Sequence, residues 1–277
     1  MKPGKIKTIN LTMRLVIAGL FLLDGMPLAF AQDKHDISMA IYGGVNDYHN
    51  RDDLYSPLAY SATRVQSVFE LTFNKPESIK SLNFSLAYGQ VETSTGFQDS
   101  DNILSNLQFN YARRLVATHV LGQRLDLYMG SVSEYFLNGN YYNLFSGDGA
   151  DDVNLSFIST LSTGLNLTAR YHIAPRHNVT IQGYAPLLHY LVTLPYAGYD
   201  ERLMKGIGHP FLILLKYGRL TSLNDYRALS LATDYNFSLS HTIGFTLTHR
   251  IRAYTADIPR HSKMFSQDLL LGVHYDF

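Results

Sequence analysis

Apolar and polar residues alternate along most of the chain with a period of two. Val65, Phe69 and Phe73 fall on one parity, whereas Gln66 and Glu70 fall on the other. Successive side chains of a β-strand point to opposite faces, so such a stretch forms a strand with one apolar and one polar face. The strands predicted in this way cover residues 37–45, 65–73, 82–88, 103–111, 125–129, 153–161, 165–173, 179–188, 210–218, 229–239, 243–252 and 267–277.

This pattern predicts twelve strands, with ten as the alternative number. Residues 153–173 keep one parity throughout, which is too long for a single membrane-spanning strand of about 9–11 residues. We therefore expect a tight turn at Ser162-Thr163-Gly164 that separates two strands. The alternative number arises because each strand signal is weak, and the strands around 153–173 and 210–218 have the weakest support.

The last eleven residues combine a regular alternation with an aromatic carboxy terminus. Leu269, Leu271, Val273, Tyr275 and Phe277 share one parity, and mostly polar residues take the other. This stretch resembles the terminal strand of bacterial outer-membrane β-barrel proteins, whose final Phe is read by their assembly machinery. The resemblance implies a transmembrane antiparallel up-and-down β-barrel in the bacterial outer membrane. It also implies that Tyr275 and Phe277 form the signal for the assembly machinery, with membrane lipid as the other partner.

The amino-terminal segment has the organisation of a secretory signal peptide. Basic residues precede an apolar core at 15–23, and Ala29-Phe30-Ala31 forms a small-x-small cleavage site. The apolar core is too short for a transmembrane helix. We therefore expect residues 1–31 to be removed after export and residues 32–277 to form a single barrel domain.

The composition agrees with a barrel and removes several function classes. The formal net charge is zero, which gives no electrostatic basis for nucleic-acid binding. Charged residues make up 17% of the chain, below the quarter typical of soluble domains. A mean hydropathy of −0.07 is too low for a bundle of membrane helices. The chain has no Cys, and no motif for a metal, nucleotide or other cofactor is present.

Twelve strands would place long loops outside and short turns in the periplasm. The outer loops would be residues 46–63, 92–102, 134–152, 174–178, 219–225 and 255–264. The periplasmic connections would be residues 75–81, 115–123, 162–164, 189–209 and 240–242. The segment 189–209 is unusually long for its side, and two interpretations stay open: it closes the periplasmic mouth, or it is an ordinary large turn.

Charged residues on the polar parity are expected to face the lumen. They are Glu70, Asp126, Arg170, His172, Asp234, Arg250, Arg252, Asp268 and His274. One hypothesis is a narrow, porin-like pore for a small solute, lined by Arg250 and Arg252. The other is a structural network of ion pairs that fills and stabilises the barrel.

A second candidate function is a lipid-modifying enzyme at the outer rim. Asn46, Asp47 and His49 lie where the first strand is predicted to leave the membrane, and a carboxylate there could orient a His or hold Ca²⁺. Outer-membrane phospholipases carry a His-x-Ser-Asn motif, and none of the eleven His residues is followed two positions later by Ser. No enzymatic activity is therefore assigned. A surface binding protein acting through the long loops is the third candidate, and a secreted β-sandwich is the rival fold.

Overall fold

The computed structural model describes residues 36–52, 56–93, 99–143, 153–194, 210–257 and 261–277. The predicted signal peptide, residues 1–31, lies outside this part of the chain. The elements in the described part are β1 (Asp36–Asp52), β2 (Ser56–Lys75), β3 (Ser78–Thr93), β4 (Asp99–Val120), β5 (Gln123–Asn143), β6 (Val153–Ala174), β7 (His177–Leu194), α3 (Pro210–Tyr217), β8 (Arg219–Ser222), β9 (Tyr226–Ser238), β10 (Ile243–Ala256) and β11 (Ser262–Asp276).

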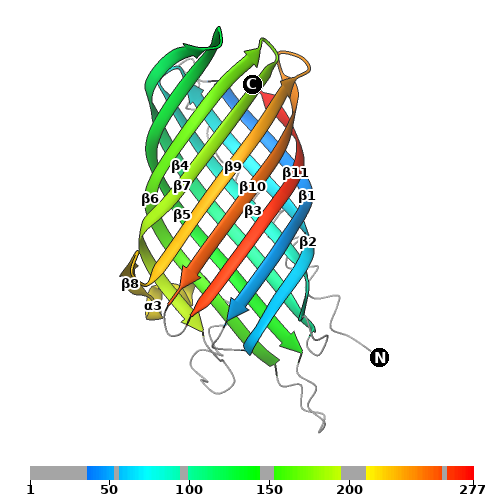
Figure 1. Ribbon diagram of the computed structural model, residues 1–277, viewed down its shortest axis with the longest axis vertical. Coiled ribbons are helices and arrows are strands. Elements are labelled where there is room, and N and C mark those ends of the chain that lie inside the picture. The colour runs from blue at the N-terminus through cyan, green and yellow to red at the C-terminus, as the bar shows by residue number, and fades with distance from the viewer. Residues whose placement is uncertain (1–35, 53–55, 94–98, 144–152, 195–209, 258–260) are drawn as a thin grey trace. The chain divides into compact units, whose positions relative to one another are not determined.

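Ten of these strands close into an antiparallel barrel (Figure 1). Each strand from β1 to β7 pairs with the next, β7 pairs with β9, and the sheet continues through β10 to β11. The barrel closes where β11 pairs with β1, from Ser38 opposite Asp276 to Asp52 opposite Ser262. β8 is a short additional strand beside the end of β7. The predicted all-β barrel is confirmed, with the alternative number of ten strands.

The prediction of twelve strands is wrong at two places. Residues 153–173 belong to one strand, because Ser162, Thr163 and Gly164 lie inside the pairing of β6 with β5 and β7. β6 has 22 residues, which is more than a strand needs to cross a bilayer. The expected length of a spanning strand therefore gave the wrong reason to divide this stretch in two. Residues 210–217 form the helix α3. A short apolar run fits either period, so alternation alone cannot identify a strand there.

Helix α3 lies on the outer wall of the barrel. Its side chains Ile213 and Leu214 are buried against Phe157 of β6 and Val192 of β7. Both strand residues have the outward parity, since their neighbours Ile158 and Leu191 point into the lumen. The helix therefore covers apolar wall residues from the outside.

The two faces of the wall have the opposite polarity from those of a soluble sheet. On β11, Leu269, Leu271 and Val273 are 53%, 63% and 50% exposed, whereas the alternating residues Ser266 and Asp268 are buried. An apolar outer face around a polar interior is the arrangement of a transmembrane β-barrel. The rival β-sandwich is excluded, because the sheet closes on itself and its polar face is the inner one.

The two ends of the barrel differ in their connections (Figure 1). The turns at residues 76–77, 121–122, 175–176 and 239–242 lie at the same end as Phe277, which we call the turn end. The opposite end, the loop end, carries the connections from β1 to β2, β3 to β4, β5 to β6, β7 to β9 and β10 to β11. Short turns beside the carboxy terminus are typical of bacterial barrels.

Two predicted outer loops are largely strand. β1 continues through residues 46–52, and β5 continues through 134–143. The β1 stretch is polar on the face that should be apolar inside a bilayer, because Asp47, His49 and Arg51 point outward, whereas Tyr135 and Leu137 of β5 keep a less polar outer face. A strand that projects beyond the membrane needs no apolar outer face, so its pattern resembles that of a loop.

The reduced strand number also moves two connections to the other end. Residues 174–178, predicted to lie outside, form the turn between β6 and β7 at the turn end. Residues 189–194 belong to β7, which runs to the loop end, and residues 195–209 lie outside the described part. Most of the segment 189–209 thus lies outside the described part, and both interpretations of it, closure of the periplasmic mouth or an ordinary large turn, stay predictions.

Candidate functional site

The structure places all nine charged residues that were predicted to face the lumen on the inward parity of their strands. They are Glu70 on β2, Asp126 on β5, Arg170 and His172 on β6, Asp234 on β9, Arg250 and Arg252 on β10, and Asp268 and His274 on β11. Strand alternation alone positions them, because every second residue points inward. They do not form one continuous row, and separate groups of contacts hold them.

The group nearest the turn end is centred on Asp126. Arg124 Nε lies 2.9 Å from its Oδ2 atom, His172 Nε2 lies 3.2 Å from the same oxygen, and Arg114 Nη1 lies 3.9 Å from Oδ1. The Asp126 side chain is only 2% exposed. Three basic groups around one buried carboxylate form a structural ion-pair cluster.

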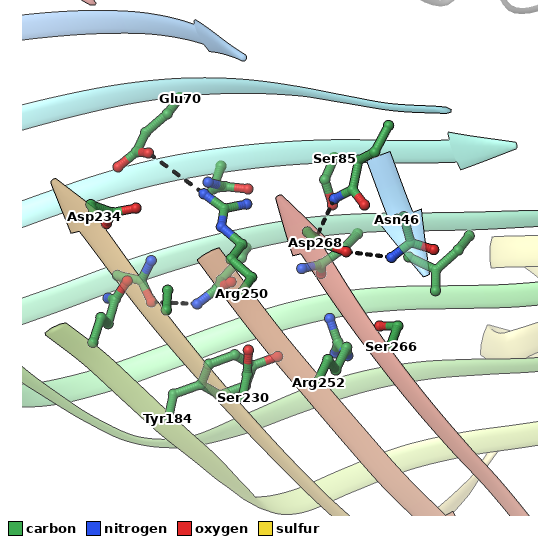
Figure 2. A pocket seen from close by; sticks show the side chains of 18 residues that line it. Asn46, Glu70, Ser85, Tyr184, Ser230, Asp234, Arg250, Arg252, Ser266 and Asp268 are labelled. Carbon is green, nitrogen blue, oxygen red and sulfur yellow. Dashed lines mark hydrogen bonds and ion pairs between the residues drawn. The ribbon is translucent and has the colours of Figure 1, made fainter. Parts of the chain in front are cut away.

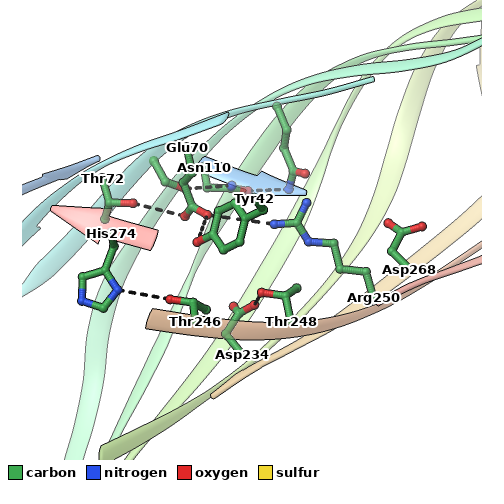
Figure 3. Close-up of polar contacts among 12 residues, drawn as sticks. Tyr42, Glu70, Thr72, Asn110, Asp234, Thr246, Thr248, Arg250, Asp268 and His274 are labelled. Atoms are coloured by element: carbon green, nitrogen blue, oxygen red, sulfur yellow. Dashed lines mark hydrogen bonds and ion pairs between the residues drawn. The ribbon is translucent and has the colours of Figure 1, made fainter. Parts of the chain in front are cut away.

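A second group joins Glu70 and Arg250 across the lumen (Figure 3). Tyr42 and Thr72 each donate a hydrogen bond of 3.2 Å to Glu70, and Arg250 Nη2 lies 4.0 Å from Glu70 Oε2. On a neighbouring strand, Thr248 donates a 2.7 Å hydrogen bond to Asp234. These carboxylates thus have polar partners inside the barrel, as buried charges require.

A third group surrounds Asp268 near the middle of the barrel (Figure 2). Asn46 and Gln66 donate hydrogen bonds to its two oxygens, the second at 2.9 Å. Arg64 Nε donates to Asn46 Oδ1 at 2.9 Å, and its guanidinium lies 4.0 Å from the centre of the Tyr48 ring. The chain from Arg64 through Asn46 to Asp268 links a buried cation to a buried anion.

A fourth group pairs Arg252 with Glu134. Arg252 Nη2 lies 2.6 Å from Glu134 Oε1, with side chains that are 10% and 2% exposed. Tyr184 donates a hydrogen bond to the same carboxylate oxygen, and the guanidinium stacks 4.0 Å from the Phe136 ring. This is the most deeply buried ion pair among the described residues.

Sequence reasoning missed four charged members of these groups, Arg64, Arg114, Arg124 and Glu134. Arg64 precedes Gln66 by two, whereas Arg124 and Glu134 share the parity of Asp126 on their own strand. They were overlooked because each lay at the edge of a stretch interpreted as a loop. Extending the strand parity beyond the apolar residues would have found them.

The lumen is open in its turn half and filled in its loop half. A cavity of about 260 Å³ near the turn end is lined by Arg170, His172 and His274. A smaller cavity of about 60 Å³ follows toward the loop end and is lined by Arg250 and Arg252. Glu70 and Asp234 border both cavities, so these two spaces meet at the second group.

Aromatic side chains close the lumen beyond the smaller cavity. Tyr48, Phe136, Tyr226 and Tyr254 are at most 3% exposed and belong to one buried cluster. The Tyr254 ring contacts Phe136 edge-on at 5.7 Å and stacks on Tyr226 at 5.6 Å. Asn138 donates hydrogen bonds to the hydroxyls of Tyr48 and Tyr254 at 3.0 and 2.9 Å. Rings from four strands thus pack together inside the loop half of the barrel.

The three rim candidates do not share one face of the wall. Asn46 points into the lumen and is 1% exposed, whereas Asp47 and His49 point outward from β1. His49 Nε2 lies 3.4 Å from Asp47 Oδ2, and Gln267 donates a 3.2 Å hydrogen bond to the same carboxylate oxygen. Ser61 of β2 is the direct cross-strand neighbour of His49 and is exposed on the same outer face.

Tyr275 and Phe277 lie on the outer face at the turn end. Their rings contact each other at 4.8 Å, and Phe277 is 71% exposed. The Phe277 N–H donates a 2.9 Å hydrogen bond to the Ile37 carbonyl, which fixes the carboxy terminus to β1. Their predicted role as an assembly signal stays a prediction.

Among the described residues, no group of three or more His, Cys, Asp or Glu side chains could hold a metal ion. In the same part of the chain, no helix is both long and apolar enough to cross a membrane.

Several solved structures resemble this fold. The translocator domain of the autotransporter NalP from Neisseria meningitidis is 8% identical, covers 97% of this chain and 98% of its own, and gives a TM-score of 0.43. Ail, the attachment invasion locus protein of Yersinia pestis, is 10% identical, covers 87% and 98%, and gives 0.36. The transport unit of the autotransporter AIDA-I from Escherichia coli is 11% identical, covers 91% and 94%, and gives 0.36. No family model and no curated protein matches the sequence.

Proposed function

We propose that this protein is an integral barrel of the bacterial outer membrane whose lumen is sealed against solutes. The observation that carries the proposal is the ring cluster of Tyr48, Phe136, Tyr226 and Tyr254 across the loop half of the lumen. A selective pore lined by Arg250 and Arg252 would need a path past these rings. The paired charges of the turn half support a structural role, since each charged group has partners that hold it in place.

The proposed orientation follows from the two ends. The turn end with Phe277 faces the periplasm, and the loop end faces the exterior, as is usual for bacterial barrels. Export through the signal peptide 1–31 and recognition of Tyr275 and Phe277 by the assembly machinery complete the proposal. The exposed leucines of the outer wall would then contact membrane lipid.

Single-channel recording in planar bilayers tests the sealed lumen. We expect no steady current from the unaltered protein and a measurable current from the double variant Phe136→Ala/Tyr254→Ala, which removes two rings of the cluster. Phe109→Ala is the matched control, because Phe109 is 49% exposed on the outer wall. A steady current through the unaltered protein would overturn the proposal.

One observation favours a second candidate function, lipid hydrolysis at the outer wall. Asp47, His49 and Ser61 lie together on the outer face of the wall near the loop end, in the order carboxylate, imidazole, hydroxyl. In such a site the Ser61 hydroxyl attacks a lipid ester carbonyl while His49 accepts its proton. His49 then gives this proton to the lysolipid alcohol that leaves as the ester C–O bond breaks, and water hydrolyses the acyl-Ser61 ester to fatty acid and free Ser61. The test is release of fatty acid from phospholipid vesicles with added Ca²⁺. Ser61→Ala should abolish it and Ser67→Ala, an exposed serine of the same strand, should not. Equal rates in both variants would refute this candidate.

A further inference from the structure

Strand β7 changes its partner part-way along its length. Residues from His177 to Tyr184 pair with β9, whereas Leu188 to Leu191 pair with β8. Within the described part of the chain, Ala185 and Pro186 pair only with β6, and residues 226–229 of β9 pair only with β10. We call this interruption of the wall the β7–β9 gap.

The gap is a place where the wall can part with little loss of hydrogen bonding. Backbone groups without partners in hydrocarbon cost several kcal/mol each, which makes a continuous strand pair hard to separate. Pro186 has no N–H group to leave unpaired, so it tolerates the interruption. The pairs that border the gap are Tyr184 with Ser230 and Leu188 with Ser222.

Leucine side chains surround the gap on its outer side. They are Leu187 and Leu188 on β7, Leu220 on β8, Leu223 in the following turn and Leu229 on β9, exposed by 37%, 52%, 74%, 45% and 61%. These exposed leucines let lipid chains approach the wall without meeting a polar side chain.

Apolar side chains line part of the lumen behind the gap, next to the buried pair of Glu134 and Arg252. Tyr226 and Leu191, on the two strands that border the gap, belong to the same buried cluster as Ile158 and Phe136. Apolar side chains therefore lie on both sides of the wall at the gap, outside as leucines and inside as this cluster.

A buried histidine stands at the inner edge of the gap. His189 is completely buried, its Nδ1 atom lies 3.0 Å from Ser162 Oγ, and its ring meets Tyr226 edge-on at 4.6 Å. Its Nε2 atom has no hydrogen-bond partner among the described residues. A buried polar atom without a partner is unfavourable, and a polar group of a bound molecule would relieve it.

We propose that the β7–β9 gap is a lateral passage through which one acyl chain of an outer-leaflet lipid reaches the apolar cluster in the lumen. The hydrocarbon replaces contacts among the rings, and His189 Nε2 meets the ester or hydroxyl group at the head of the chain. The lumen stays sealed along its axis while opening sideways. The proposal rests on the membrane location proposed above.

Tryptophan fluorescence in vesicles tests the passage, because the chain has no native Trp. Three single variants place the reporter outside the gap, behind it and far from it: Leu187→Trp, Tyr226→Trp and Tyr42→Trp. Tyr42 is a buried inward-facing tyrosine of the turn half, so it is the matched control for Tyr226. Each variant is reconstituted in phosphatidylcholine with brominated or unbrominated acyl chains. Bromine quenches a Trp that it contacts.

A disulfide across the gap then separates passage from simple proximity to lipid. The chain has no native Cys, so Leu188→Cys/Ser222→Cys fixes β8 to β7, and Ile181→Cys/Thr233→Cys fixes an intact pair of β7 and β9 as the control. We expect quenching at positions 187 and 226 but not at 42. We also expect loss of the quenching at 226 under the first disulfide only.

The outcomes separate the two proposals. No quenching at position 187 would show that the barrel does not sit in the bilayer and would refute the membrane location. Quenching at 187 with equal signals at 226 and 42, or a signal at 226 that survives the Leu188–Ser222 lock, would overturn the passage alone. If Tyr226→Trp fails to fold, Phe136→Trp supplies a second reporter in the same cluster.

Discussion

Replacement of Glu134 by Gln should destabilise the barrel strongly. The change removes the carboxylate that neutralises Arg252, while both side chains stay in the lumen with 2% and 10% exposure. Breaking a buried ion pair by removing one partner costs about 3–5 kcal/mol. Arg252 borders a cavity of about 60 Å³, and a cavity needs only about 10–15 Å³ to admit a water molecule. Water can partly solvate the guanidinium of Arg252 once its partner is removed. We therefore expect a loss of unfolding free energy at the lower end of this range, about 3 kcal/mol.

The assay is urea unfolding of protein refolded in phosphatidylcholine vesicles, with the folded fraction determined from migration of unheated samples on gels. Glu92→Gln is the control, because Glu92 is exposed on the outer face of β3. Its free energy of unfolding should change by less than about 0.5 kcal/mol. The double variant Glu134→Leu/Arg252→Met removes both charges and should stay within about 1 kcal/mol of the unaltered protein.

Two results would contradict this reasoning. A loss of less than about 1 kcal/mol in Glu134→Gln would mean that Arg252 is solvated or neutralised without Glu134. A double variant as unstable as the single one would mean that the loss reflects altered packing around Phe136 and Tyr184, which also contact the pair.

Three other perturbations have defined outcomes. Asp268→Ala leaves the amides of Asn46 and Gln66 without their acceptor and should lower the free energy of unfolding by about 2 kcal/mol; an unchanged urea midpoint would contradict this. Gly44→Ala would bring a Cβ atom against the backbone of the β11 strand, whereas Gly43→Ala meets nothing within 4 Å. The first should destabilise by more than about 1 kcal/mol and the second by less than about 0.5 kcal/mol in the same titration, and equal values would refute the close approach. Phe277→Ala should reduce the amount of folded barrel in cells without changing refolding in vesicles, and equal cellular yields would exclude it as an assembly signal.

The alternation of the sequence predicts the barrel and the inward direction of its charged residues well. Glu70 and Asp126, for example, need only the parity of their own strand to be placed, since a strand has two faces. The contacts that the inward charged residues make with one another cannot be predicted in this way. The pairing of Glu134 with Arg252 depends on the register of strands that are distant in the sequence, and parity holds no information about register.

The strand count and the closed lumen were harder to predict for physical reasons. A strand that projects beyond the bilayer loses its apolar outer face, as in residues 46–52, so hydrophobicity marks only the membrane-embedded part. The inward rings of Tyr48, Phe136 and Tyr254 break the rule that a barrel interior is polar. Their neighbours on the opposite parity follow no rule, since they are polar around Tyr48 but include Leu137 next to Phe136, so the pattern alone does not show which face is the inner one.

The closure of the barrel between β1 and β11 has a consequence for how the chain folds. The pair of Ser38 with Asp276 joins nearly the two extremes of the described chain. The entropy of closing so long a loop amounts to about 5 kcal/mol, and it must be offset before the final contacts form. Until the last strand has emerged from synthesis, β1 has only β2 as a neighbour and exposes one unpaired edge. Contacts this distant in sequence slow folding, so the rate of barrel formation should be set by the arrival of β11 at β1.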